Sequence, residues 1–230
     1  MKGILYAYLT LNKKYWLVAA VCFVFSIMLG IYAICIAPQD AEAADIASMI
    51  VPISSLLAPI MLSEAMPRDL EANIKSRFAY HILSAGVSKH CYVTSYLLVN
   101  LIPIALGIGL IALEFSLLSL FTAFKGIFAI FPLLALITTA GNLINWINMP
   151  LTISFKSAEK ASIIIGLIAA IGISIPALIN IDLFKQVMAE KIYEILVPSA
   201  EFQLIAYGII ALLYAIFYFI FYKRVKRGDL

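Results

Sequence analysis

Six long apolar runs dominate the chain, and short polar segments separate them. A helix rises about 1.5 Å per residue, so roughly 20 apolar residues span a hydrocarbon core of about 30 Å. The runs of this length cover residues 15–37, 46–66, 93–115, 126–149, 161–180 and 203–222. This pattern predicts an all-α membrane protein with six transmembrane helices, forming a single domain over residues 1–230. The first run exceeds the apolar core of a secretory signal, so we expect it to be retained.

Three segments outside these runs have the periodicity of amphipathic helices. Residues 1–14 have a weak pattern that suits an N-terminal helix at the inner membrane interface. In the polar loop 67–92, residues 68–85 carry an apolar side chain at every fourth position and predict one amphipathic helix. The segment 181–202 repeats this pattern before the last run, and we expect it to lie at the outer surface. A shorter loop over residues 150–160 is expected to follow the fourth run.

The lysines and arginines fix the expected orientation. With both termini in the cytoplasm, thirteen of the sixteen basic residues lie inside, and only Lys125, Lys185 and Lys191 lie outside. The opposite orientation would invert this ratio. Aromatic residues fall at the predicted cytoplasmic interfaces, as expected for an aromatic belt: Tyr15, Trp16, Trp146 and Tyr222.

Composition supports the membrane class and excludes others. Hydrophobic residues make up 64% of the chain and charged residues 13%, whereas soluble domains are nearer half and a quarter. The net charge is only +3 and the basic residues are dispersed at the ends of apolar runs, so nucleic acid is not an expected partner. Cys22, Cys35 and Cys91 lie in or beside apolar runs, which is typical of small core residues rather than of disulfides or a metal site.

The sequence contains no enzyme signature and no phosphate-binding loop, so we expect neither catalysis nor ATP binding in this chain. Glu64 and Glu114 fall near the ends of predicted spans, where a carboxylate is expected to reach the interface. An ion-coupled carrier usually has ionisable groups near the membrane centre, and none is predicted here. If the protein moves a solute, the energy is expected to come from another subunit.

Two sets of residues are candidates for function. The polar and aromatic side chains of the loop 67–92 could bind a soluble partner, or the loop could simply lie on the lipid headgroups. This first set is Arg68, Asp69, Glu71, Lys75, Arg77, Phe78, Tyr80 and His81. The second set, in the fourth run, could line a polar translocation path or form hydrogen bonds between helices, and consists of Asn142, Asn145 and Asn148. The basic cluster at residues 223–227 is expected to anchor the chain at lipid headgroups.

Two stretches resemble the bacterial ABC-2 type transporter permeases. The first, EAMPRDLEANIKSRFAYHILSAGVSKHCYVTSYL, matches the order of the family's residues at Glu64, Asp69, Tyr80, Leu83, Val87, Ser88, Lys89, Tyr92 and Val93. The second, NMPLTISFKSAEKASII, matches at Pro150, Leu151, Phe155, Lys160 and Ala161. The chain departs from the family at Gly86, where proline is usual, at Ser157, where glycine is frequent, and at Ser95–Tyr96.

The resemblance implies an ABC-2, type V exporter-like fold in the bacterial cell membrane. It implies a permease that forms a homodimer or heterodimer and recruits a separate ABC ATPase, which binds ATP and Mg. In that family, the loop after the second span holds the coupling helix that docks on the ATPase. The expected substrate is an amphipathic or hydrophobic peptide, as in the exporters of phenol-soluble modulins and bacteriocins.

Other functions stay open at this point. A lipid or a drug would also suit the apolar spans. An accessory or immunity-type membrane protein would have the same spans without transport activity. An intramembrane enzyme is disfavoured because no catalytic cluster is present in the sequence.

Overall fold

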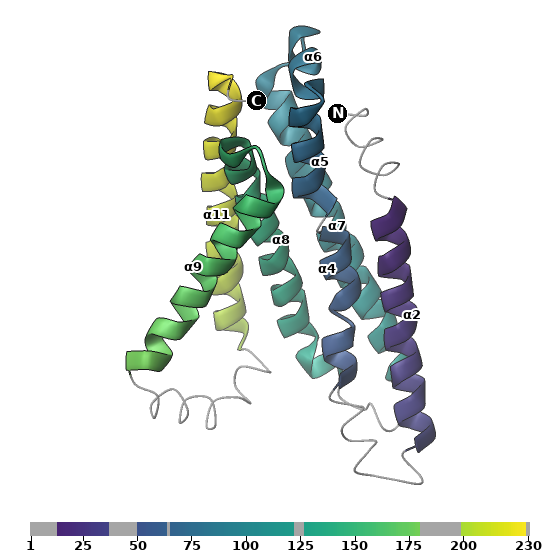
Figure 1. Cartoon of the computed structure of the whole chain (residues 1–230). Helices are drawn as coiled ribbons and strands as arrows, with labels where there is room; N and C mark the ends of the chain where they lie inside the picture. Colours follow the sequence, from purple (N-terminus) through teal and green to yellow (C-terminus); the bar gives the residue numbers. More distant parts are fainter. Residues whose placement is uncertain (1–12, 37–49, 64, 122–126, 180–198, 229–230) are drawn as a thin grey trace. The chain divides into compact units, whose positions relative to one another are not determined.

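The computed structural model describes residues 13–36, 50–63, 65–121, 127–179 and 199–228, and every regular element among them is a helix. The chain divides into two compact units. Unit 1 comprises Met1–Met66 and Ser95–Asn142, and unit 2 comprises Pro67–Thr94 and Leu143–Leu230. The helices are α2 (Lys13–Ile36), α4 (Leu57–Ser63), α5 (Ala65–Lys75), α6 (Phe78–Ser84), α7 (Lys89–Leu118), the 3-10 helix η2 (Ile127–Ile130), α8 (Phe131–Phe155), α9 (Ala158–Ile179) and α11 (Ala200–Arg227) (Figure 1).

Five stretches of the described residues are long and apolar enough to cross a membrane. They are Lys13–Tyr32, Ile50–Lys75, Lys89–Leu118, Ile127–Phe155 and Ala200–Arg227. The chain is therefore an all-α, multi-pass membrane protein. The fifth predicted span falls on α9, which is a helix but not one of these five, so the count of six spans stays a prediction.

The long helices leave broad apolar surfaces uncovered. In α2, Leu17, Val21 and Met28 are mostly exposed, and in α11 Leu204 and Leu212 are. In water such surfaces would be unfavourable, whereas lipid solvates them as well as a protein interior does. The faces thus suit contact with lipid or with another membrane-embedded helix.

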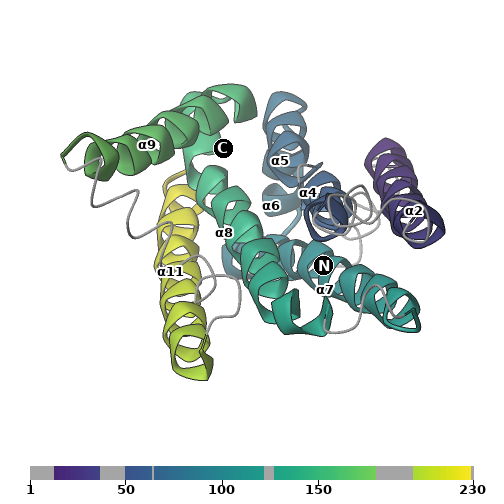
Figure 2. The ribbon, with the colours of Figure 1, turned by 90° about the horizontal axis from the view of Figure 1, so that it is seen from below.

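Unit 1 packs α2 against α4 and the second half of α7 (Figures 1 and 2). Ala19, Ala58 and Leu62 form one buried cluster, and small residues here let the helices approach closely. A second cluster surrounds Phe115, whose ring makes edge contacts with Phe128 and Phe131.

A buried carboxyl in unit 1 differs from the sequence expectation. Glu114 is only 1% exposed and lies within α7, in contact with Ser26 of α2, rather than reaching a membrane interface. Glu114 does lie about one turn before the end of α7 at Leu118, but the expectation of an accessible carboxyl was wrong, because Ser26 of α2 packs against it.

Unit 2 is held together by an aromatic contact between α8 and α11. The Trp146 indole stacks on Tyr214, meets Phe221 edge-on and donates its N–H to the Tyr214 carbonyl at 3.2 Å. Trp146 is fully buried, so its predicted place in an aromatic belt is wrong. A single tryptophan at the end of an apolar run does not reveal whether it faces lipid or a neighbouring helix.

Two predicted boundaries also change. The loop expected over 150–160 is a two-residue turn, because α8 continues through Pro150 to Phe155 and buries Met149 and Ile153. The second span is interrupted at Ser55–Leu56, where the helix of residues 50–54 ends before α4 begins. The helix predicted within residues 1–14 and the segment 181–202 lie almost wholly outside the described residues.

A close approach of three helices in unit 1 yields a test of the packing. A Cβ atom at Gly107 of α7 would lie 2.8 Å from the Pro59 Cβ and 3.2 Å from the Thr138 Cγ2. We expect Gly107→Ala to lower the free energy of unfolding by about 1–3 kcal/mol, because the rigid proline ring must move. Gly109→Ala is the matched control, since a Cβ there has no neighbour within 4 Å.

The control should be neutral, or stabilising by up to about 1 kcal/mol, because alanine favours helix. Thermal unfolding of both purified variants in detergent, followed by circular dichroism, measures the difference. Equal melting temperatures for the two variants would contradict the packing described for Gly107.

Candidate functional site

Three polar segments of unit 2 gather at one end of that unit, which we call the charged end: residues 67–92, 156–160 and 223–227 (Figure 1). The Glu71 side chain accepts a hydrogen bond from the Ala158 amide at 2.8 Å, and Lys89 Nζ donates to the Lys226 carbonyl at 2.9 Å. Ten of the sixteen lysines and arginines of the chain lie in these segments. This clustering agrees with the prediction that all three segments face the same side of the membrane.

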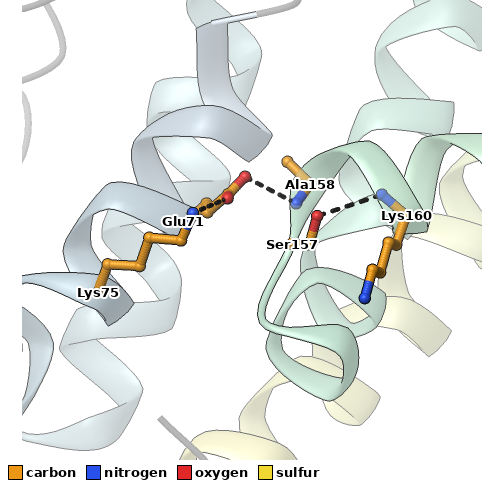
Figure 3. A network of polar contacts seen from close by, with 5 residues as sticks. All are labelled: Glu71, Lys75, Ser157, Ala158 and Lys160. Carbon is orange, nitrogen blue, oxygen red and sulfur yellow. Dashed lines mark hydrogen bonds and ion pairs between the residues drawn. The ribbon is translucent and has the colours of Figure 1, made fainter.

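Glu71 is the centre of the polar contacts at this end (Figure 3). Its Oε1 atom forms an ion pair with Lys75, one helical turn further along α5. Its Oε2 atom accepts from the backbone of Ala158, the first residue of α9. One carboxylate therefore joins the polar loop directly to the start of a long apolar helix.

The start of α9 explains why a carboxylate is favourable there. The first amides of a helix have no partner within the helix, and the aligned peptide dipoles place partial positive charge at this end. Ser157 caps the helix, with its hydroxyl accepting from the Lys160 amide at 3.3 Å, and Glu71 satisfies the Ala158 amide (Figure 3). The turn is short because Lys156 adopts a left-handed conformation, with φ of 52°, directly after α8.

The amphipathic segment 68–85 is two helices rather than the single one predicted. Arg77 has φ of 57° and ψ of 15°, in the left-handed region, and this ends α5 and starts α6. The Arg77 amide donates to the Ile74 carbonyl at 3.1 Å, which closes the last turn of α5. A left-handed residue other than glycine costs about 1–2 kcal/mol, so arginine is not expected at such a position. The apolar periodicity of residues 68–85 also continues across Arg77, and the sequence therefore does not predict this bend.

Beyond the bend, α6 exposes its aromatic residues. Phe78 is 39% exposed and Tyr80 is 66% exposed, and the Tyr80 ring makes an edge contact with His81. Exposed aromatic rings beside charges are typical of surfaces that bind a partner, and they also suit a membrane interface.

The predicted coupling residues all lie in α5, α6 and the bend between them. Arg68, Lys75, Arg77, Phe78, Tyr80 and His81 are exposed, whereas Asp69 and Glu71 are half-buried. Leu70, on the same helix as Glu71, is fully buried and anchors α5. Within the set, Glu71 forms a hydrogen bond to the first residue of α9.

The first turn of α7 and the end of α11 form a contact that sequence reasoning missed. The His90 ring meets the rings of Tyr218 and Tyr222 edge-on, and the Thr94 hydroxyl lies 3.0 Å from the Tyr218 hydroxyl. Lys89 adds its hydrogen bond to the Lys226 carbonyl near the end of α11. The one available signal was the spacing of Tyr218 and Tyr222, which places both rings on one face of the helix.

The three asparagines of α8 do not form one site within either unit. Asn142 belongs to unit 1, where its amide donates to the Thr138 carbonyl and its backbone carbonyl lies 3.4 Å from the Asn100 amide. Asn148 belongs to unit 2 and lies 3.4 Å from the Ser162 hydroxyl of α9, while Asn145 is half-buried. The Asn148 amide thus bonds to a second helix, whereas the Asn142 amide bonds within α8, and the buried Oδ1 atoms of both residues have no partner among the described residues. A translocation path stays a prediction.

The described residues contain no group of three or more histidine, cysteine or acidic side chains that could hold a metal ion. No family model, curated protein or solved structure matches the chain. The charged end thus has two features: a hydrogen bond that connects α5 to α9, and a surface of exposed polar side chains on α5 and α6.

The Glu71 contact can be tested by removing the carboxylate. We expect Glu71→Ala to lower the free energy of unfolding by about 1–3 kcal/mol, because a charged hydrogen bond is lost and the buried Ala158 amide keeps no partner. Glu71→Gln should retain part of this stability, since its amide oxygen can accept the same hydrogen bond. Thermal unfolding in detergent measures both variants.

Glu159→Gln is the matched control, because Glu159 is an exposed carboxylate in the first turn of α9. We expect it to cost less than about 1 kcal/mol, through the helix dipole alone. A larger loss for Glu159→Gln than for Glu71→Ala would show that charge near the helix start, and not the hydrogen bond, is what stabilises this end.

Proposed function

We propose that the protein is the membrane-spanning permease subunit of an ATP-driven ABC exporter with the ABC-2 type fold. The proposal includes six spans, with α9 as the fifth, and both termini in the cytoplasm of a bacterial cell. The observation that carries it is the hydrogen bond from the Ala158 amide to Glu71, which joins the polar loop to the start of α9.

Such a connection is what a coupling element needs. A soluble ATPase can drive a membrane subunit only if rigid contacts transmit its movement to a transmembrane helix. A movement of α5 is transmitted through Glu71 to the first turn of α9, and the buried Leu70 keeps α5 from sliding freely. The same end carries the residues that match the permease family in sequence, among them Asp69, Tyr80 and Lys160.

The docking surface in this proposal is α6 with the bend before it. Phe78 and Tyr80 are exposed beside Arg77 and His81, so aromatic anchors and charges are presented together. Aromatic side chains and arginine are enriched among the residues that dominate binding energy at protein interfaces. Docking on α6 and transmission through α5 are thus assigned to different residues, and they can be separated by mutation.

The remaining features of the proposal follow from the apolar faces. The exposed apolar residues of α2 and α11 suit lipid or a second permease copy, either identical or related. ATP and Mg belong to the partner ATPase. The substrate class is an amphipathic or hydrophobic peptide, and a lipid or a drug is the alternative cargo.

Co-purification tests the docking assignment. We expect Phe78→Ala together with Tyr80→Ala to reduce by roughly tenfold or more the amount of ATPase that co-purifies from the host membrane, because two central aromatic anchors are removed. Phe202→Ala is the matched control, since Phe202 is an exposed aromatic residue at the start of α11, away from the charged end.

Glu71→Ala separates transmission from docking. It should leave the ATPase bound but abolish ATP-dependent efflux of a fluorescent amphipathic peptide from inverted vesicles. Recovery of wild-type protein with no nucleotide-hydrolysing partner, under conditions that preserve other membrane complexes, would contradict the permease assignment and favour an accessory or immunity-type protein.

A further inference from the structure

A chain of three short oxygen contacts crosses unit 1 within its apolar interior. The Ser26 hydroxyl of α2 lies 2.6 Å from a Glu114 carboxyl oxygen of α7 and 2.6 Å from the Ser54 hydroxyl. The Ser54 hydroxyl also donates to the Val51 carbonyl at 2.8 Å. Ser26, Ser54 and Glu114 are each 5% exposed or less.

Counting protons along this chain distinguishes two states of Glu114. Three hydrogen bonds need three protons, and the hydroxyls of Ser26 and Ser54 supply two. If Glu114 is ionised, one contact of 2.6–2.8 Å brings two lone pairs together without a proton, which is repulsive. If Glu114 carries a proton, each group donates once: Glu114 to Ser26, Ser26 to Ser54, and Ser54 to the Val51 carbonyl.

Among the described residues of unit 1, no basic side chain is recorded as a partner of this carboxyl. In the described part of unit 1, the only basic side chains are Lys13 and Lys14, in the first turn of α2. The other titratable groups in the described part of unit 1 are Tyr15, Cys22, Tyr32 and Cys35 on α2 and Tyr96 on α7, whereas Lys89, His90, Cys91 and Tyr92 lie in the first turns of α7, in unit 2. The recorded side-chain partner of the Glu114 carboxyl is Ser26. Residues 50–63 and 127–142 carry no titratable side chain.

We propose that Glu114, Ser26 and Ser54 form a proton-binding site inside the membrane, whose occupancy joins α2, α7 and the helix of residues 50–54. An ionisable residue within a transmembrane segment is most often functional. The interruption at Ser55–Leu56 follows Ser54 directly, so the site adjoins the point where the helix of the second span is interrupted. Loss of the proton breaks the chain, which links the separation of these helices to proton release. This inference does not depend on the proposed transport function.

Infrared spectroscopy of the full chain in lipid nanodiscs tests the site. We expect the wild-type protein at neutral pH to show the carbonyl band of a protonated carboxyl in an apolar site. That band should be lost in Glu114→Gln and retained in Glu201→Gln, whose carboxyl is exposed at the start of α11. Loss of carboxylate bands instead in Glu114→Gln would overturn the proposal, because Glu114 would then be ionised.

Thermal unfolding gives an independent measurement. The folded chain holds a proton that the unfolded chain releases, so the wild-type melting temperature should fall as the pH rises. Glu114→Gln should remove this part of the pH dependence while keeping the fold, because its amide N–H can donate to Ser26. Glu114→Ala should lower the melting temperature at every pH. A wild-type melting temperature that rises with sodium chloride but not with choline chloride at fixed pH, and that rises with neither salt in Glu114→Gln, would show that the site binds a metal cation, which would overturn proton binding.

Discussion

The polar end of unit 2 depends on one carboxylate that satisfies the start of the long apolar helix α9. Where a helix begins, its first amides have no partner within the helix, and at a membrane surface each needs water, a cap or another side chain. Glu71 supplies that partner to Ala158 from a separate segment of the chain. The Ala158 amide needs a hydrogen-bond acceptor, and because Glu71 supplies it, the polar loop is linked to α9.

The two units solve the same physical problem differently. In unit 2, charges lie at the end of the unit and are bonded to one another and to helix ends, as in the contacts of Glu71 with Lys75 and of Lys89 with α11. In unit 1, the polar groups lie among apolar side chains and must satisfy one another, as Ser26, Ser54 and Glu114 do. The charged end of unit 2 thus leaves charged groups at its surface, whereas these three polar groups of unit 1 are enclosed.

The sequence predicts the membrane class and the side of the membrane that each polar segment faces, because both predictions rest on totals: the hydropathy of long runs and the number of basic residues in each loop. Length and hydropathy predict long apolar helices, and the lysines and arginines predict that residues 67–92, 156–160 and 223–227 lie together. Contacts between residues that are far apart in the chain do not change the hydrophobic pattern of the sequence, so that pattern does not predict them. Glu71 looks like any charge on an amphipathic face, Arg77 does not signal a left-handed bend, and Glu114 looks like the end of a span. In each case the outcome is decided by a partner far away in the chain or by a single backbone angle.

The central claim is that three segments form one surface on the cytoplasmic side of the membrane. Labelling with a membrane-impermeant maleimide tests it directly, in a variant without Cys22, Cys35 and Cys91 that carries a single cysteine at Ser76, Lys156 or Arg227. The account predicts that all three positions react in inside-out vesicles and that none reacts in intact cells. Labelling of any one position from the outside of intact cells would contradict it.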